Sequence, residues 1–271
     1  MKSRFTKLFS LALIISLCML LLTGCGEERK AAIEAFNTEC ERIQSETSEL
    51  EELVSSCEEL INAKAAPYDE NTLSALETET TNARASLSDL PEQPTNTEEI
   101  LTLVEELKST SYVDQIDKLS TAKSDYETSV KIMEQITNPS EEFVIECLKQ
   151  IEGISAYDAA TEDNDPNGNL HKDGGYTSAV YFQYDKVDQS QTFGDTLIEK
   201  GTDAGGQIEV YATAEDAQKR CDYLSGFDGS ILSSGSHKVI GTVLIRTSNL
   251  LTATEQTELE DALVSVFTTL K

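Results

Sequence analysis

The sequence has no tryptophan, only two histidines and three methionines, and few basic residues. Its 21 Lys and Arg residues stand against 49 Asp and Glu residues, so the formal net charge is −28 at pH 7. Nucleic acids and anionic membrane surfaces bind through Lys and Arg, which replace released counterions. The charge balance therefore argues against nucleic acid as a partner and favours cationic, metal-bearing or uncharged ligands.

The shortage of histidine also removes most catalytic and zinc-binding patterns. Neither His171 nor His237 has a cysteine at metal-ligand spacing, and the chain has no Gly-x-Ser-x-Gly motif. Ser236 precedes His237, but adjacent side chains of a strand point to opposite faces. We expect a protein that is not an enzyme. A hydrolase of envelope polymers that uses acidic side chains is one alternative, and a solute-binding lipoprotein is another.

A long apolar run occurs only near the N-terminus. Residues 1–7 carry three basic residues and no acidic one, residues 8–22 are almost wholly apolar, and Leu22-Thr23-Gly24-Cys25 follows. These features are typical of a secretory signal, and the run is short for a spanning helix. The pattern resembles that of bacterial lipoproteins. It predicts a signal peptide at 1–24 and a lipid, including palmitate, on Cys25, which would anchor the chain to the extracytoplasmic face of the membrane.

Cysteine is scarce beyond this segment. Four cysteines remain in the mature chain, at positions 40, 57, 147 and 221. Cys40 and Cys57 belong to one expected helix and lie roughly 25 Å apart along it, which is too far for a bridge. Cys147 and Cys221 lie on apolar helical faces, so we favour two reduced thiols in the core. A Cys147–Cys221 disulfide is the alternative that an extracytoplasmic location permits.

Apolar residues recur three and four positions apart through the next hundred residues. The first stripe contains Ile33, Phe36, Cys40, Ile43, Thr47, Leu50, Val54, Cys57 and Ile61. Residues 65–67 interrupt it, a second stripe covers 73–90, and a third begins at Ile100 and changes phase near 109–111. The pattern predicts a three-helix bundle or a coiled-coil stalk over residues 25–137. Self-association of the long first helix is the open alternative.

A different pattern begins at Asn138-Pro139-Ser140-Glu141, which is typical of a helix start with Asn138 as the cap. The rest of the chain alternates helical and extended segments. Strands are expected near residues 155–161, 176–186, 207–211 and 238–246. We predict an α+β domain over 138–271 with one mixed sheet and helices largely on one side, so the whole chain would be multidomain.

Several segments of this second half resemble a known group of proteins. They are residues 138–144 (NPSEEFV), 161–168 (TEDNDPNG), 174–177 (GGYT) and 234–239 (SGSHKV). Together they are similar to the C-terminal domain of surface lipoproteins of gut Gram-positive bacteria, which are related to helical surface proteins described as extracellular-matrix-binding-like. The resemblance implies a cell-surface location and supplies no established activity.

The loop at residues 163–175 is the main chemical clue. Asp163, Asp165, Asn167 and Asn169 stand at alternating positions with Gly168 between them, as the ligands of a calcium loop do. The glutamate that normally completes such a loop is replaced by Gly174, and Asp173 is the nearest substitute. The sequence leaves two interpretations, which are a calcium site formed by Asp163, Asp165, Asn167, Asn169 and Asp173, or a tight turn.

These observations together predict a lipid-anchored, non-catalytic surface protein. A helical stalk would present an α+β module that binds a protein or glycan ligand or organises the cell envelope. Exposed tyrosines would favour such a ligand, because an aromatic ring offers both an apolar face and a polar group. The candidates are Tyr176, Tyr181, Tyr184 and Tyr211.

Overall fold

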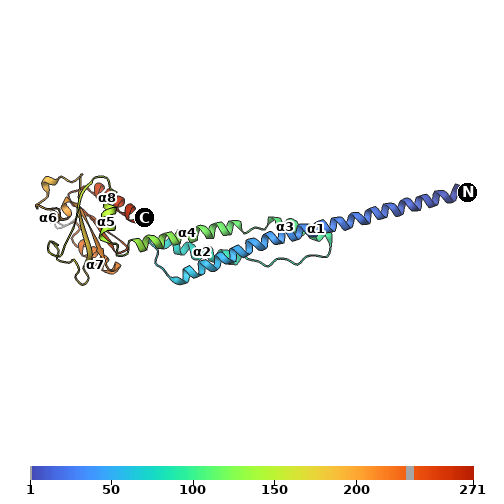
Figure 1. Cartoon of the computed structure of the whole chain (residues 1–271), viewed down its shortest axis with the longest axis horizontal. Coiled ribbons are helices and arrows are strands. Elements are labelled where there is room, and N and C mark those ends of the chain that lie inside the picture. Colours follow the sequence, from blue (N-terminus) through green and yellow to red (C-terminus); the bar gives the residue numbers. More distant parts are fainter. Residues whose placement is uncertain (1, 230–234) are drawn as a thin grey trace. The chain divides into compact units, whose positions relative to one another are not determined.

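The computed structural model describes the backbone of residues 2–229 and 235–271 and the side chains of residues 26–229 and 235–271. The chain forms two compact units, one of Met1–Ala65 with Asn71–Tyr126 and one of Ala66–Glu70 with Glu127–Lys271. Figure 1 traces helices through the first unit and a sheet flanked by helices in the second. The side chain of Cys25, on which the lipid is expected, lies outside the described residues.

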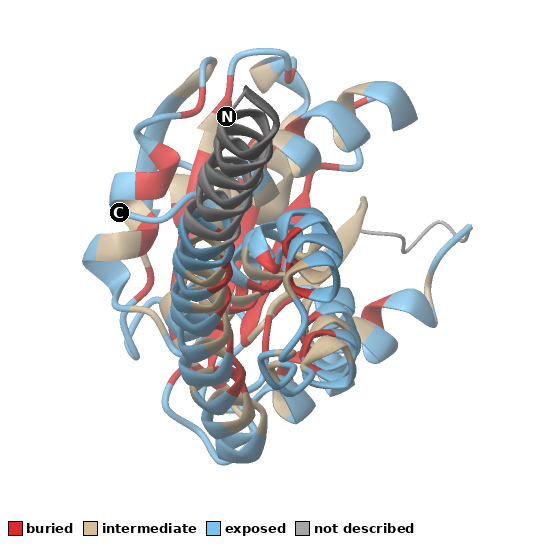
Figure 2. Cartoon of the chain, turned by 90° about the vertical axis from the view of Figure 1, so that its right-hand side faces the viewer, coloured by how far each residue is buried: buried red, intermediate tan, exposed pale blue. Residues whose placement is uncertain are grey.

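The helical unit contains α1 (Lys2–Ala63), α2 (Glu70–Ser86), α3 (Thr97–Ser109) and the first part of α4 (Val113–Gln135). The predicted stripe of α1 is buried at Ile43, Leu50, Val54 and Cys57, whereas the opposite side of α1 is exposed (Figure 2). The other helices also bury apolar residues, namely Leu76, Ala83, Ile100, Val104, Leu107, Leu119 and Tyr126. The described part of the α1 stripe is therefore covered within the chain, as in a bundle.

The third predicted helix is two helices in the structure. The kink expected near 109–111 is a complete break, because α3 ends at Ser109 and α4 begins at Val113. Thr110 between them has an extended backbone, with φ −84° and ψ 126°. The boundary between the two compact units lies inside α4, between Tyr126 and Glu127. The sequence pattern suggests that a new domain begins at residue 138, which is further along the chain.

The second unit holds a sheet of five strands in the order β1-β2-β3-β5-β4. The strands are β1 (Ile154–Ala159), β2 (Tyr176–Tyr184), β3 (Gly205–Tyr211), β4 (His237–Ile240) and β5 (Val243–Thr247). The helices and short turns between and around them are α5 (Glu141–Leu148), η1 (Gln189–Gln191), α6 (Leu197–Lys200), η2 (Gly201–Ala204), α7 (Ala214–Ser225) and α8 (Ala253–Thr268). The α+β class predicted for this half is confirmed.

The prediction of a mixed sheet is wrong, since every strand pair is antiparallel. The chain does cross over from β3 through α7 to β4, and these two strands run in the same direction. They are not neighbours, because β5 folds back and pairs antiparallel with both of them. β3 and β4 therefore do not form a parallel pair in this sheet.

The single strand expected at 238–246 is a hairpin of β4 and β5. Its turn contains Gly241 at φ +55°, a conformation that favours glycine. A Cβ atom at Gly241 would also lie 2.7 Å from the carbonyl oxygen of Ile136. The next residue, Thr242, accepts a hydrogen bond at its side-chain oxygen from the Asn138 backbone N–H at 2.6 Å. The hairpin tip therefore packs against residues 136–138.

The caps of four helices follow from short-range hydrogen bonds of Thr, Ser and Asn side chains. Thr213 and Thr252 cap α7 and α8, and Thr252 forms a capping box with Glu255. The expected cap Asn138 is replaced by Ser140, whose side chain accepts from the Phe143 N–H. Asn138 instead has φ +47° and precedes the helix. Asn96, and not a neighbouring threonine, caps α3.

Helices cover both faces of the sheet, which corrects the expectation that they lie largely on one side. Alternate residues of β2 separate the two layers: Val180 and Phe182 belong to one core and Ala179 and Tyr181 to the other. The first core includes α5 and α8, at Val144, Cys147, Leu148, Leu259, Leu263 and Phe267. The second includes α6 and α7, at Ile198, Ala217 and Leu224. The period of two along the strands produces this division.

The disulfide alternative is wrong for this reason. Cys147 is buried on α5 in the first core, and Cys221 is half-buried on α7 beside the second. The sheet lies between the two residues, and both thiols are free. Burial raises the pKa of each thiol above its ordinary value, although Lys271 partly opposes this shift at Cys147.

Candidate functional site

The acidic loop is organised around the Asp165 carboxylate. Its Oδ2 accepts hydrogen bonds from the backbone N–H groups of Asn169 (2.7 Å) and Leu170 (2.9 Å). Its Oδ1 accepts from the Asn167 N–H at 3.1 Å and from the Tyr176 hydroxyl. Burial alone would raise the pKa of Asp165, but these four donors hold it below its ordinary value. The carboxylate therefore closes its own loop.

This geometry does not support the calcium site. The lone pairs of Asp165 that would face a cation are already directed at N–H and O–H donors. Asp163 and Asp173 are exposed, and the Asn167 side chain faces the hydroxyls of Tyr176 and Tyr181, each at 3.4 Å. Among the described residues, no three His, Cys, Asp or Glu side chains are placed to hold a metal ion. The loop is a structured turn.

The four tyrosines named as candidates for an aromatic surface are buried. Tyr176, Tyr181, Tyr184 and Tyr211 are all less than a tenth exposed. Burial raises the pKa of Tyr176, Tyr181 and Tyr211 well above the ordinary value, and the carboxylates of Asp165 and Glu209 reinforce the effect. Among the residues with described side chains, the large aromatic residues that face solvent are Tyr157, Phe193 and Tyr223.

A buried group of polar residues lies between α7 and the sheet, and we call it the polar layer. It consists of Gln207, Glu209 and Tyr211 on β3, Arg246 on β5 and Arg220 on α7. Gln207 and Glu209 are fully buried and Arg246 is 6% exposed. Alternation along β3 places its three members on one face, and Gln207 pairs in register with Arg246.

Glu209 is the centre of the polar layer. Nη1 of Arg246 donates at 2.8 Å to Glu209 and at 2.8 Å to the side-chain oxygen of Gln207. The Tyr211 hydroxyl donates to the other Glu209 oxygen at 2.7 Å, and Nε of Arg220 lies 3.4 Å from that same oxygen. Burial alone would lower the pKa of Arg220, but Glu209 holds it above its ordinary value. Two guanidinium groups thus share one buried carboxylate.

Sequence reasoning missed this layer. Its signal is the alternation Gln207, Glu209, Tyr211, which makes one face of β3 polar in a strand that is buried throughout. Arg246 and Arg220 are distant in the chain and become neighbours of Glu209 only through the strand order and the packing of α7. A buried Glu–Arg cluster of this kind either stabilises one strand register or serves a ligand.

A serine–histidine pair lies at the end of α7. Ser225 Oγ and His237 Nε2 are 2.9 Å apart, and Oδ2 of Asp228 lies 3.7 Å from the same nitrogen. The serine hydroxyl donates to the Cys221 carbonyl at 3.0 Å. Nδ1 of His237 is buried without a hydrogen-bond partner among the described residues. The pair lacks the oriented base that activates a nucleophile.

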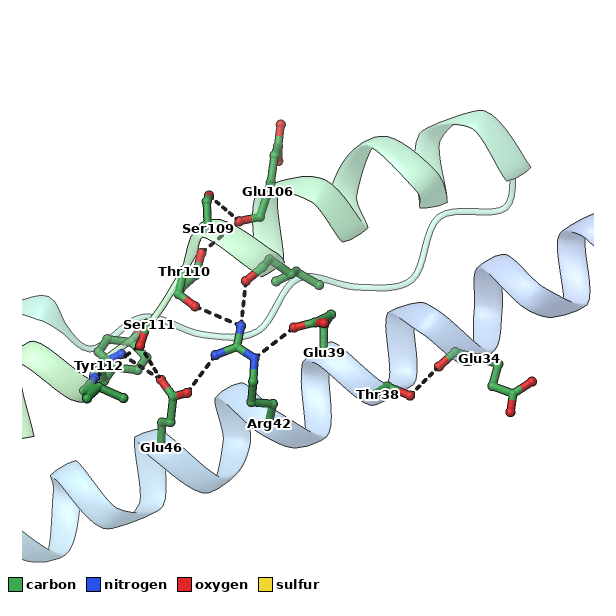
Figure 3. A network of polar contacts seen from close by, with 12 residues as sticks. Glu34, Thr38, Glu39, Arg42, Glu46, Glu106, Ser109, Thr110, Ser111 and Tyr112 are labelled. Atoms are coloured by element: carbon green, nitrogen blue, oxygen red, sulfur yellow. Dashed lines mark hydrogen bonds and ion pairs between the residues drawn. The ribbon is translucent and has the colours of Figure 1, made fainter.

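The helical unit has its own polar cluster at the break between α3 and α4 (Figure 3). Nη2 of Arg42 on α1 donates to the carbonyls of Leu107 (2.8 Å) and Thr110 (2.9 Å). Nη1 of Arg42 donates to Glu46 at 2.7 Å, and Glu46 accepts from the Tyr112 N–H at 2.8 Å. Burial alone would raise the pKa of Glu46, but these donors lower it. The cluster satisfies backbone groups that the helix ends leave unpaired.

A pocket of about 380 Å³ also lies in the helical unit, between α1 and the segment after α2. It is lined by Gln44, Thr47, Glu51 and residues 87–90, which include Asp89. The lining has two carboxylates and no basic residue. Its chemistry does not select a particular ligand, so the polar layer is the better candidate site.

The chain was compared with family models, curated proteins and solved structures, and none of them matches. The resemblance to surface lipoproteins therefore stays a prediction from the quoted motifs.

Proposed function

We propose that the chain is a lipid-anchored surface protein whose α+β unit binds a ligand and does not catalyse a reaction. The observation that carries the proposal is the N-terminal pattern of basic residues, apolar run and Leu22-Thr23-Gly24-Cys25. Lipid on Cys25 would hold the protein at the extracytoplasmic face of the bacterial membrane. Among the described residues, none of the helices combines the length and apolarity required to cross a membrane.

The binding role rests on what the second unit contains. The polar layer holds Gln207 and Arg246 in buried positions and Arg220 at its edge, and a few such convergent polar groups are common in ligand sites. The Ser225–His237 pair does not have the geometry of an activated nucleophile, which favours binding over hydrolysis. The net charge of −28 disfavours nucleic acid and anionic lipid surfaces as ligands.

The anchor is tested with the Cys25→Ala variant, expressed in a bacterium and followed by membrane fractionation and labelled palmitate. The wild-type chain is expected in the membrane fraction with label, and the variant without label and outside that fraction. Cys40→Ala is the matched control, because Cys40 is a free cysteine of the same helix and should keep both properties. Retention and labelling of Cys25→Ala would contradict the proposed anchor.

A further inference from the structure

Three N–H donors of the polar layer are buried without a hydrogen-bond partner among the described residues. They are Nε2 of Gln207, Nε of Arg220 and Nε of Arg246. Arg220 Nε is close enough to Glu209 for an ion pair, at 3.4 Å, but not aligned for a hydrogen bond. Buried donors are normally paired, since an unpaired one costs about 1–3 kcal/mol. Three such donors in one layer indicate that an acceptor belongs there.

The charges of the layer point to the same conclusion. Arg220 and Arg246 carry two positive charges, and Glu209 supplies one negative charge. Both oxygens of Glu209 already accept strong hydrogen bonds, from Arg246 and Tyr211. The neighbouring carboxylate of Asp165 lies outside the layer and keeps its negative charge, because its hydrogen bonds come from neutral donors, the Tyr176 hydroxyl and the backbone of its own loop. Within the layer itself, two guanidinium groups share the single carboxylate of Glu209.

We infer that the polar layer binds the carboxylate group of a small ligand. A carboxylate supplies one negative charge and up to four lone-pair directions, which suits a layer in which two guanidinium groups share one carboxylate and three donors lack a hydrogen-bond partner. Guanidinium groups are well suited to this role because their planar array of N–H groups complements a carboxylate. The inference deepens the proposed binding function and depends on it.

The layer meets solvent at Arg220 on α7. Arg220 is the most exposed of its charged members, with a side-chain exposure of 15%, against 0% for Glu209 and 7% for Arg246. Beside it, Tyr223 is 59% exposed and packs edge-to-face on Phe227 at 5.1 Å. The Arg220 guanidinium lies 5.5 Å from the centre of the Tyr223 ring. An exposed aromatic ring next to a carboxylate site suits a sugar acid, whose ring can lie on the tyrosine face.

The test measures binding of three probes to the purified full chain in detergent, by calorimetry and by thermal shift. Glucuronate represents sugar acids, N-acetylglycine represents the carboxylate end of a peptide, and glucose is the neutral control. Glucuronate is expected to bind and to raise the melting temperature, and glucose is expected to do neither. Binding of N-acetylglycine with the same affinity would show that the layer recognises the carboxylate group and that the sugar ring does not contribute to the affinity.

Two variants are expected to change the affinity for glucuronate in opposite directions. Arg220→Gln removes one positive charge at the accessible edge and should weaken glucuronate binding at least about tenfold, as expected for a charged hydrogen bond. Glu209→Gln removes the competing carboxylate and should strengthen binding. Lys219→Gln is the matched control, because Lys219 precedes Arg220 on α7 but is 65% exposed and pairs with Glu215. It should leave the affinity unchanged.

The inference is overturned if neither carboxylate binds, or if glucose binds as well as glucuronate. Equal losses for Arg220→Gln and Lys219→Gln would also overturn it, because they would reduce the effect to net charge. A purely structural or water-filled layer would show destabilisation of Arg220→Gln without any probe binding to the wild type. None of these outcomes bears on membrane anchoring, which the Cys25→Ala experiment tests separately.

Discussion

Asp165 accepts hydrogen bonds from three backbone amides and one tyrosine hydroxyl, which is close to the full capacity of a carboxylate. The residues around it, Asp163 and Asp173, are exposed and do not share these bonds. Composition alone suits either a calcium loop or a turn, because both use Asp, Asn and Gly. The hydrogen bonds that both Asp165 oxygens accept from the loop and from Tyr176 favour the turn over the calcium loop.

Asp165→Ala is expected to lower the free energy of unfolding by about 1–3 kcal/mol, because it leaves backbone donors of the loop unpaired. Asp163→Ala, which alters an exposed carboxylate of the same loop, should change it by less than about 0.5 kcal/mol. Urea unfolding measures both. Melting curves in EDTA and in millimolar calcium should coincide for all three proteins, and a calcium-dependent shift lost in Asp165→Ala would restore the calcium interpretation.

The stability difference between the wild type and Asp165→Ala is expected to depend on pH. The pKa of Asp165 is lower in the folded state than its ordinary value of about 4, so its carboxylate stabilises the fold at neutral pH. That contribution is lost as the pH falls from about 4 through the folded-state pKa. The stability difference between wild type and Asp165→Ala should therefore shrink in this range, and a constant difference would contradict the assignment.

At the scale of secondary structure elements, the break between α3 and α4 depends on a neighbouring helix. A change in apolar phase near 109–111 indicates an irregularity but does not distinguish a kink from two helices. Arg42 and Glu46 on α1 bond the Thr110 carbonyl and the Tyr112 N–H between the two helices, and Arg42 gives the Leu107 carbonyl a second hydrogen bond. The helices can therefore separate here without leaving these backbone groups unpaired.

Arg42→Leu is expected to destabilise the helical unit by about 1–3 kcal/mol, because two carbonyls and two carboxylates lose the hydrogen bonds that Arg42 donates. Arg84→Leu is the matched control, since Arg84 makes an exposed ion pair with Glu58 that is worth about 0–1 kcal/mol. Chemical unfolding followed by far-ultraviolet circular dichroism compares them. Equal effects of the two substitutions would show that the α3–α4 junction does not depend on Arg42.

At the scale of the whole molecule, a net charge of −28 repels itself in the compact state. The Debye length shortens from about 30 Å at 0.01 M salt to about 8 Å at 0.15 M, so added salt screens most of this repulsion. The melting temperature should therefore rise over this range of sodium chloride. A sucrose series without added salt is the control for non-specific exclusion effects, and a melting temperature that falls with salt would contradict the expectation.

The caps at Thr213 and Thr252 and the buried stripe of α1 were predictable because they depend on residues within a few turns of one helix. The proposed lipoprotein signal also rests on a continuous stretch of sequence, and it stays a prediction. These features involve only local spacing, so the amino-acid sequence determined them before any packing is considered. The α+β class of the second unit follows from the same local patterns.

The tertiary structure decided the features that join distant residues. Gly241 turns one predicted strand into a hairpin, and β5 enters between β3 and β4, which makes the sheet wholly antiparallel. The sheet then separates Cys147 from Cys221 and brings Arg246 to Glu209 across 37 positions of sequence. Each outcome depends on which strands are neighbours and which face a helix covers, and such choices arise from long-range packing, which local periodicity does not record.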